Sequence, residues 1–129
     1  MVARRLSSVA VDVAFDALPD ISYPVREVGG CSVVAAGGEL DLWTCPALRK
    51  ALHVAAESSR RLVIDLTAVT FLDSSGIGVL LDAHLQRRHR APVVLVGAVG
   101  MVRRVLEVSG VSGEFRFCGS VDEATAALA

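Results

Sequence analysis

Two short, uninterrupted apolar runs constrain the fold of this chain more than any other feature of its sequence. They cover residues 62–64 and 93–96, and residues 75–90 between them show the apolar spacing of a helix. Uninterrupted apolar strands are typical of a parallel sheet that is covered on both faces. A helix that connects two strands of one sheet makes them parallel and gives a right-handed crossover. We therefore expect strands 62–66 and 93–96 to be parallel and central in the sheet.

The N-terminal part of the chain has a different pattern, which predicts antiparallel strands. Residues 9–15 alternate between apolar and smaller or polar side chains, residues 23–28 form a second candidate strand, and residues 31–36 form a third. The pair Gly29-Gly30 predicts a tight hairpin between the last two, which must then be antiparallel. Gly37-Gly38 is expected to end the third strand.

Helix signals occur at four places, so we expect an α/β fold in which a mixed sheet packs against about four helices. One helix is expected at 45–58 behind Thr44, and a second at 75–90. A third ends at Gly110, and a short strand at 115–117 follows it. A capping box at 120–123 starts the last helix. The apolar faces are assigned to Ile77, Leu80, Leu81 and Leu85 in the second helix, and to Met101, Val102, Val105 and Leu106 in the third.

Composition limits the classes of function that this chain can serve. Its 129 residues suffice for one domain, and 53% of them are hydrophobic, which excludes disorder of the whole chain. The 13 basic and 14 acidic residues give a net charge of −1, which does not suit nucleic acid or an anionic membrane. The apolar runs are too short to span a bilayer, and no signal peptide is visible. We expect a cytoplasmic protein without direct contact to nucleic acid or membrane.

Motifs for catalysis or metal binding are absent from the sequence. Cys31, Cys45 and Cys118 are widely spaced, so they predict neither a disulfide framework nor a zinc site. They are expected to be buried, although the position of Cys45 in the first turn of a helix allows a thiol with a lowered pKa. The sequence contains no GxxxxGK loop, no GxSxG elbow and no HExxH pair. It therefore predicts no enzyme, no metal site and no cofactor.

Two polar clusters interrupt the apolar pattern. Asp73, Ser74 and Ser75 lie between a strand and a helix and are followed by Gly76. In a structural interpretation, Asp73 or Ser74 caps the helix and the glycine allows close packing on the sheet. In a functional one, the serine hydroxyl is exposed, and a phosphate there meets free N–H groups at the positive end of the helix dipole. The second cluster, at 38–41, by itself indicates a loop with a local cap.

The order of the two clusters resembles that of the STAS-domain family, and more narrowly that of the bacterial anti-sigma-factor antagonists. Residues 25–128 follow the family pattern, which implies a STAS-like mixed sheet and a STAS domain over residues 21–129. The similar segments are Gly-Glu-Leu-Asp at 38–41, Pro-Ala-Leu-Arg at 46–49, Leu-Val-Ile-Asp-Leu at 62–66 and Val-Thr-Phe-Leu-Asp-Ser-Ser-Gly-Ile-Gly-Val-Leu-Leu at 69–81.

The resemblance also implies a site and a function. Ser74 matches the phosphorylated serine of the family, and Asp41 matches an acidic residue that lies near it; Asp73, Ser75 and Gly76 match its immediate surroundings. In such proteins the unphosphorylated form binds an anti-sigma factor, which is a serine kinase, and so releases a sigma factor. The kinase phosphorylates the antagonist and ends the interaction, and a serine phosphatase restores it. The antagonist is the substrate of this chemistry and not its catalyst.

Two features depart from the family pattern, and one alternative function stays open. Residues 1–20 precede the usual start of the family and are expected to be an N-terminal extension, with a possible extra strand. Trp43, beside Asp41, is either an exposed partner contact or a buried residue. The alternative function is a STAS subunit of a lipid or anion transport system, or of a signalling complex that senses a small ligand. The sequence leaves the oligomeric state open.

Overall fold

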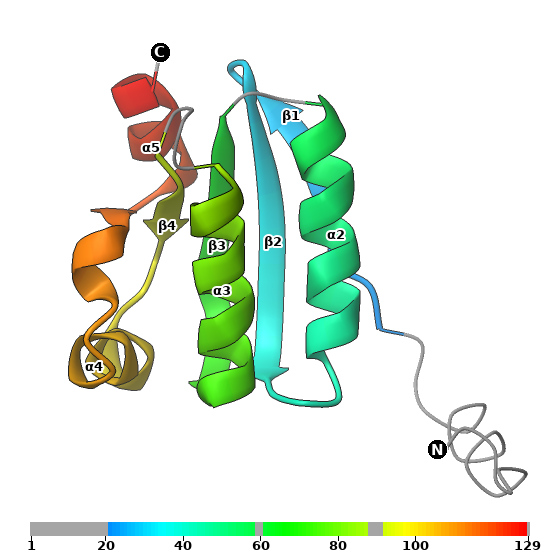
Figure 1. Cartoon of the computed structure of the whole chain (residues 1–129). Helices are drawn as coiled ribbons and strands as arrows, with labels where there is room; N and C mark the ends of the chain where they lie inside the picture. The colour runs from blue at the N-terminus through cyan, green and yellow to red at the C-terminus, as the bar shows by residue number, and fades with distance from the viewer. Residues whose placement is uncertain (1–20, 59–60, 88–91, 129) are drawn as a thin grey trace, which may run out of the picture.

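The computed structural model describes residues 21–58, 61–87 and 92–128, which form a five-stranded sheet packed against helices (Figure 1). The strands lie side by side in the order β1-β2-β3-β4-β5. β1 and β2 are antiparallel, and the other pairs are parallel, so the mixed α/β fold is confirmed. The elements are β1 (Val25–Val28), β2 (Cys31–Leu40), α2 (Cys45–Ser58), β3 (Leu62–Leu72), α3 (Ser74–Gln86), β4 (Val94–Val96), α4 (Gly100–Val108), the 3-10 turn η1 (Ser112–Glu114), β5 (Arg116–Cys118) and α5 (Val121–Leu128).

The two apolar runs form neighbouring parallel strands, as their composition predicts. Val63 of β3 pairs with Val94 of β4, and Asp65 pairs with Val96. β3 is the middle strand of the sheet, and all three residues of β4 are buried. Helix α3 connects them, which is the crossover that parallel pairing requires. The expected strand at 9–15 lies outside the described residues.

β2 and β3 are both longer than their apolar runs suggest. The expectation that Gly37-Gly38 ends β2 is wrong, because the strand continues to Leu40. The pairing with β3 shifts between Ala35 and Gly37 and again between Gly38 and Glu39, and Gly38 has a φ of 69°. The glycines therefore allow irregular pairing within one strand, which any other residue would strain at Gly38. β3 extends to Leu72, beyond the expected end at 66.

The sheet buries side chains on both faces, because neighbouring residues of a strand point to opposite sides. On one face, Val34 and Ile64 belong to a large core together with buried residues of α2, α3 and α4. On the other face, Val33 and Val63 pack with Ala124 of α5. In the described part of the chain, no helix has the length and apolar character needed to cross a membrane.

Local sequence signals set several element ends. Gly110 follows α4 with a φ of 78°, and its N–H donates to the carbonyl of Glu107, as expected for a glycine C-cap. At the start of α5, the Glu123 N–H donates to Ser120 Oγ at 3.1 Å, while Glu123 Oε1 accepts from the Gly119 N–H. The hairpin at Gly29-Gly30 is confirmed by the pairing of the residues that flank it.

Two apolar side chains lie on the opposite side from their predicted one. Leu85 was assigned to the buried face of its helix but is 45% exposed, and Met101 is 59% exposed. Met101 lies in the first turn of α4, ahead of the part of the stripe that reaches the sheet, where Val102 and Leu106 are buried. Leu85 lies in the last turn of α3, next to the exposed Gln86. Periodicity alone does not show where a helix runs past the edge of the core.

Candidate functional site

The two polar clusters meet where β2 and β3 end. Leu40 and Leu72, the last residues of these parallel strands, are paired in register. The N–H of Asp73 donates to the carbonyl oxygen of Leu40 at 3.2 Å. Asp41 and Asp73 therefore leave the sheet from adjacent positions, and the structure brings the segments around Asp41 and Ser74 to one end of the molecule.

Asp73 caps helix α3. Its backbone is extended, and its Oδ1 accepts hydrogen bonds from the N–H groups of Ser75 at 2.8 Å and Gly76 at 3.2 Å. These groups have no acceptor within the helix, so the carboxylate stabilises both the helix start and its dipole. Of the two capping residues that the sequence allows, the structure selects Asp73.

Ser74 is the first residue of α3 and is exposed. Its hydroxyl forms no hydrogen bond with any residue that the structure describes. Ser75, by contrast, is half-buried. The two adjacent serines therefore differ in access, and Ser74 offers the more accessible hydroxyl.

Gly76 is buried and brings α3 against the end of β2. A Cβ atom at this position would lie 3.0 Å from the carbonyl oxygen of Leu40 and 3.1 Å from its Cβ. Both distances are shorter than ordinary van der Waals contacts, so only glycine fits without a shift of the helix. Gly76 thus positions the turn that carries Ser74 and presents no side chain of its own.

Asp41 organises the turn between β2 and α2. Its Oδ1 accepts from the N–H groups of Trp43 at 2.9 Å and Thr44 at 3.1 Å. Thr44 closes the turn from the other side, because its hydroxyl donates to the carbonyl oxygen of Glu39 at 2.8 Å and accepts from the Asp41 N–H at 3.0 Å. Asp41 is half-buried, so part of its carboxylate stays accessible beside the turn.

Cys45 lies beneath these carboxylates and is 5% exposed. Burial raises the pKa of the Cys45 thiol, the Asp73 carboxylate raises it further, Arg49 lowers it, and Asp41 raises it. A lowered pKa for this thiol is therefore wrong: desolvation and two nearby negative charges outweigh the helix dipole. The thiol stays protonated at neutral pH. The sensitivity of Cys45 to both Asp73 and Asp41 also places the two carboxylates near one another.

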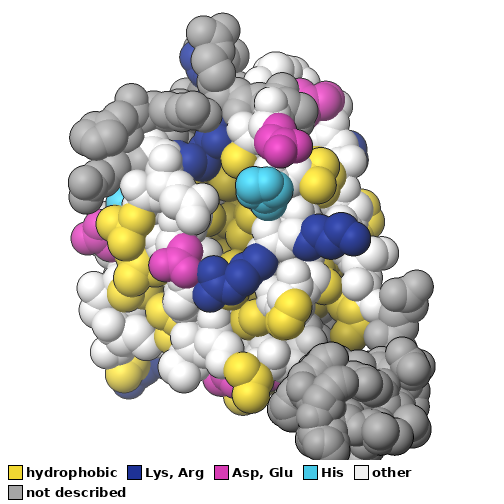
Figure 2. Space-filling view, turned by 45° about the vertical axis from the view of Figure 1, so that its right-hand side comes forward, with side chains coloured by type: hydrophobic (Ala, Val, Ile, Leu, Met, Phe, Trp, Pro, Cys, Tyr) yellow, Lys and Arg dark blue, Asp and Glu magenta, His cyan; other side chains and the backbone are white. Residues whose placement is uncertain are grey.

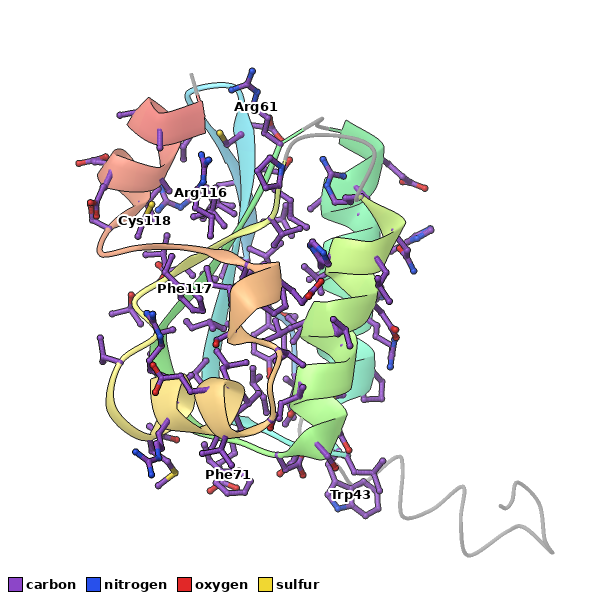
Figure 3. All side chains as sticks on the ribbon, turned by 60° about the vertical axis from the view of Figure 1, so that its left-hand side comes forward. Trp43, Arg61, Phe71, Arg116, Phe117 and Cys118 are labelled. Carbon is purple, nitrogen blue, oxygen red and sulfur yellow. The ribbon has the colours of Figure 1, made fainter. Side chains whose placement is uncertain are left out.

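Large apolar side chains are exposed at the same end of the molecule. Figure 3 shows Trp43 and Phe71 at this end, below the start of α3, where α4 also begins. Trp43 is 64% exposed, which decides between the two positions that the sequence allows. Exposed apolar side chains that gather in one place mark interaction surfaces. We call this group the apolar rim; it consists of Leu42, Trp43, Phe71, Val99 and Met101.

Sequence reasoning singles out only Trp43 from the apolar rim. The signal for the others is positional: Phe71 precedes the buried Leu72 near the end of β3, and Val99 is the N-cap of α4. Residues just beyond the ends of parallel strands meet at one edge of the sheet. An apolar residue there is therefore a candidate for a contact surface.

The site shows no arrangement for metal binding. Among the described residues, no group of three or more His, Cys, Asp or Glu side chains is placed to hold a metal ion. His53 lies in the middle of α2 and His84 in the last turn of α3, and neither is hydrogen-bonded to Ser74. The chemistry that the site offers is an accessible hydroxyl beside carboxylates and apolar side chains.

Comparisons with known proteins agree with this fold. The family model of the STAS domain matches residues 22–124. The anti-sigma-F factor antagonist RsfB of Mycobacterium tuberculosis is 33% identical over 108 residues, which cover 82% of this chain and 88% of that protein. The anti-sigma-B factor antagonist of Listeria monocytogenes is 36% identical over 81 residues, covering 61% and 71%.

A solved structure gives the same result. The crystal structure of an anti-sigma factor antagonist from Mycobacterium paratuberculosis has a TM-score of 0.76 and 34% sequence identity, and the match covers 84% of this chain and 93% of that one. Its agreement extends to the mixed sheet and the helices around it. The chain therefore belongs to the STAS-domain family, in which these relatives are anti-sigma factor antagonists.

Proposed function

We propose that this protein is an anti-sigma-factor antagonist that works in the cytoplasm and is switched by phosphorylation of Ser74. In its unmodified form it binds an anti-sigma factor that is also a serine kinase, and a sigma factor is released. The kinase phosphorylates Ser74 and ends the interaction, and a serine phosphatase reverses the modification. The observation that carries this proposal is the exposed Ser74 hydroxyl at the start of α3, beside the apolar rim.

The apolar rim and the carboxylates give the proposed partner surface two parts. Trp43 supplies a large aromatic anchor of the kind that dominates binding energy in protein interfaces. Asp41, Asp73 and Ser75 surround Ser74 with polar groups, and Gly76 holds the helix start close to β2. A partner that fits this face presents an apolar patch together with donors for the carboxylates.

A phosphate on Ser74 would change this face without changing the fold. It adds a charge of about −1.5 to −2 at neutral pH. Asp73 Oδ1 already accepts from the N–H groups of Ser75 and Gly76, so the new anion would meet a carboxylate as well as the helix terminus. Repulsion and the cost of desolvating a dianion would then oppose a close contact with the partner.

The protein acts here as a substrate and not as a catalyst. Phosphoryl transfer needs a bound nucleotide and metal, and those belong to the kinase in this scheme. The net charge of −1 gives no reason to expect direct contact with DNA, so regulation of transcription runs through the partner. No cofactor is required.

Intact-mass measurement tests the acceptor. The full chain is incubated with ATP and a candidate anti-sigma kinase from the same genome. We expect one added phosphate on the wild type and on Ser75→Ala, and none on Ser74→Ala. Phosphate on Ser74→Ala at the wild-type rate contradicts the proposal. Lipid that co-purifies with an unmodified protein would favour the transport alternative instead.

Calorimetric titration with the same kinase tests the switch. Ser74→Ala should bind like the unmodified wild type, because it keeps the apolar rim and the carboxylates. Ser74→Asp should bind more weakly, by about tenfold or more, which corresponds to 1.4 kcal/mol. Ser109→Asp is the matched control, since Ser109 is exposed at the opposite end of α4 and should leave binding unchanged. Equal affinity of the two Asp variants contradicts the switch.

A further inference from the structure

A groove runs between helices α2 and α3, on a face that the proposed switch does not use. Its volume is about 620 Å³, within the range of pockets that hold small molecules. Its floor is apolar and comes from both helices and from the start of β3. Figure 2, in which α2 comes forward, shows apolar surface lying between basic, acidic and histidine side chains. The floor residues are Leu52, Ala56, Leu62, Val79 and Ala83.

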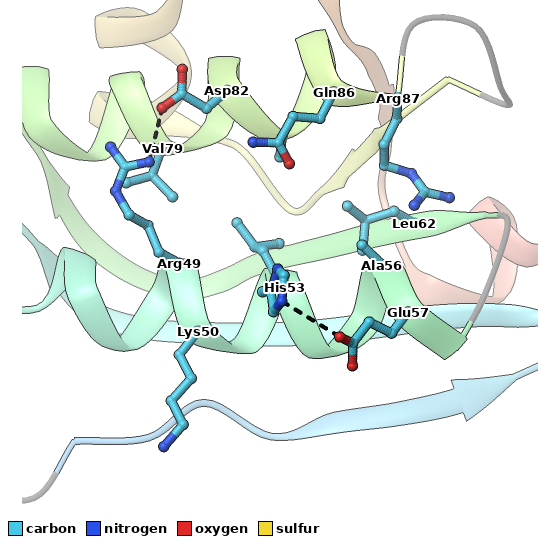
Figure 4. A pocket seen from close by; sticks show the side chains of 12 residues that line it. Arg49, Lys50, His53, Ala56, Glu57, Leu62, Val79, Asp82, Gln86 and Arg87 are labelled. Carbon is cyan, nitrogen blue, oxygen red and sulfur yellow. Dashed lines mark hydrogen bonds and ion pairs between the residues drawn. The ribbon is translucent and has the colours of Figure 1, made fainter.

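The groove exists because the two helices face each other there with small side chains. Ala56 of α2 and Ala83 of α3 both line it, and neither is large enough to fill the space between the helices. At one end Arg49 Nη1 and Asp82 Oδ2 form an ion pair of 2.8 Å that crosses from α2 to α3 (Figure 4). The opening is therefore closed at this end by charged side chains and floored by apolar ones.

Polar groups gather toward the other end of the groove. Figure 4 shows Gln86 and Arg87 extending from α3 toward α2, and His53 extending from α2 into the same gap. Lys50, although it borders the groove, points away from it. The Gln86 amide and the Arg87 guanidinium are hydrogen-bond donors, and a guanidinium matches the geometry of a carboxylate.

Burial decides the sign of the charge that a ligand meets in the groove. Arg87 is 3% exposed, whereas the side chains of Asp82 and Glu57 are 49% and 70% exposed. Glu57 also pairs with His53 at 3.5 Å. Water screens exposed charges much more strongly than buried ones. The potential at the deep end of the groove is thus governed by the buried guanidinium and is positive.

We propose that the groove between α2 and α3 binds a small apolar carboxylic acid. The carboxylate lies toward Arg87 and Gln86, and the apolar body lies on the floor between Ala56 and Val79. This site is separate from the apolar rim, so it does not depend on the proposed antagonist function. Both sites share α3, which carries Ser74 at one end and Gln86 at the other.

Titrations followed by two-dimensional amide NMR test the proposal on the full chain. The probes are octanoate, octanol and octylamine, which have the same chain length and differ in charge. We expect octanoate to give saturable shifts at residues of α2 and α3, and octanol and octylamine to bind at least about tenfold more weakly, since both lack a partner for the guanidinium. No saturable shift with octanoate, or equal affinity for octanol, overturns the proposal.

Two pairs of variants locate the site. Ala56→Leu fills the groove and should weaken octanoate by about tenfold or more, while Ala126→Leu on the exposed face of α5 should not. Gln86→Glu adds a negative charge inside the groove and should also weaken octanoate; Leu85→Glu adds the same charge outside it. Wild-type affinity in Ala56→Leu and Gln86→Glu, with the variants folded by circular dichroism, overturns the assignment.

Discussion

The backbone N–H of Asp73 donates a hydrogen bond of 3.2 Å to the carbonyl oxygen of Leu40, so the residue before Ser74 is tied to the end of β2. Through its side chain, the same aspartate accepts from the first turn of α3. The start of the helix is therefore fixed to the sheet by one residue. The stability of this junction can be measured independently of any partner.

Substitution of Gly76 should destabilise the protein. In Gly76→Ala the new methyl group meets the backbone and Cβ of Leu40, and the free energy of unfolding should fall by about 1–3 kcal/mol. Gly78→Ala in the same helix is the matched control, because a Cβ there has no atom within 4 Å. It should raise the free energy of unfolding by about 0.5–1 kcal/mol. Urea denaturation measures both, and equal effects would refute the close contact.

Loss of the Asp73 cap should cost stability in the same assay. Asp73→Ala leaves the N–H groups of Ser75 and Gly76 without their acceptor and should lower the free energy of unfolding by about 1 kcal/mol. Asp73→Asn keeps an acceptor oxygen and should retain most of the stability. If both variants unfold at the wild-type urea concentration, the cap does not stabilise the helix.

Trp43 should report partner binding, on the basis of the proposed function. It is the only tryptophan and is 64% exposed, so burial against a partner should shift its fluorescence to shorter wavelength. Trp43→Ala should weaken binding by at least about 2 kcal/mol, as aromatic anchors do, and leave unfolding nearly unchanged. Val108→Ala, at an equally exposed apolar residue at the far end of α4, is the control. Unchanged affinity of Trp43→Ala would remove the rim from the interface.

The thiols should react slowly in the folded protein. Burial raises the pKa of Cys31, Cys45 and Cys118 above the ordinary thiol value, so little thiolate is present at neutral pH. Timed alkylation followed by mass measurement should show faster labelling of all three in urea. Cys118, which is half-buried, should be the first to react without urea. Rapid labelling of Cys45 in the native protein at neutral pH would contradict this.

The same pKa shifts predict how stability depends on pH. The folded state keeps each thiol protonated to a higher pH than the unfolded state does. Stability is therefore unaffected below the unfolded thiol pKa and declines once the pH rises above it. Urea midpoints compared on either side of the ordinary thiol pKa measure the decline, with Cys45→Ser as the comparison that should lessen it.

The sequence predicts the parts of this fold that depend on local patterns. The apolar runs identify the parallel pair β3 and β4, and the Asp-Ser-Ser-Gly segment identifies the start of α3. The extents of β2 and β3 escape prediction, because irregular pairing around Gly38 is settled between strands and not within one. The exposure of Met101 escapes it too, because it depends on where the first turn of α4 leaves the core.

The candidate site divides in the same way. Asp73 as a cap follows from its position before a helix, whereas the role of Asp41 in the turn depends on the N–H groups of Trp43 and Thr44 reaching it. The groove cannot be derived from sequence, since it results from the spacing of two helices that meet only in the folded protein. Ala56 and Ala83, apart in the chain, are ordinary helix residues until that spacing is known.

The exposure of the apolar rim has a consequence for how such proteins diverge. Leu42, Trp43, Val99 and Met101 each keep more than half of their surface in water, so the core does not depend on them for its packing. Replacing them costs little folding energy, whereas Gly76 beneath them tolerates no side chain. After gene duplication, copies of this domain can exchange one partner for another by changing these side chains alone, while the buried junction stays the same.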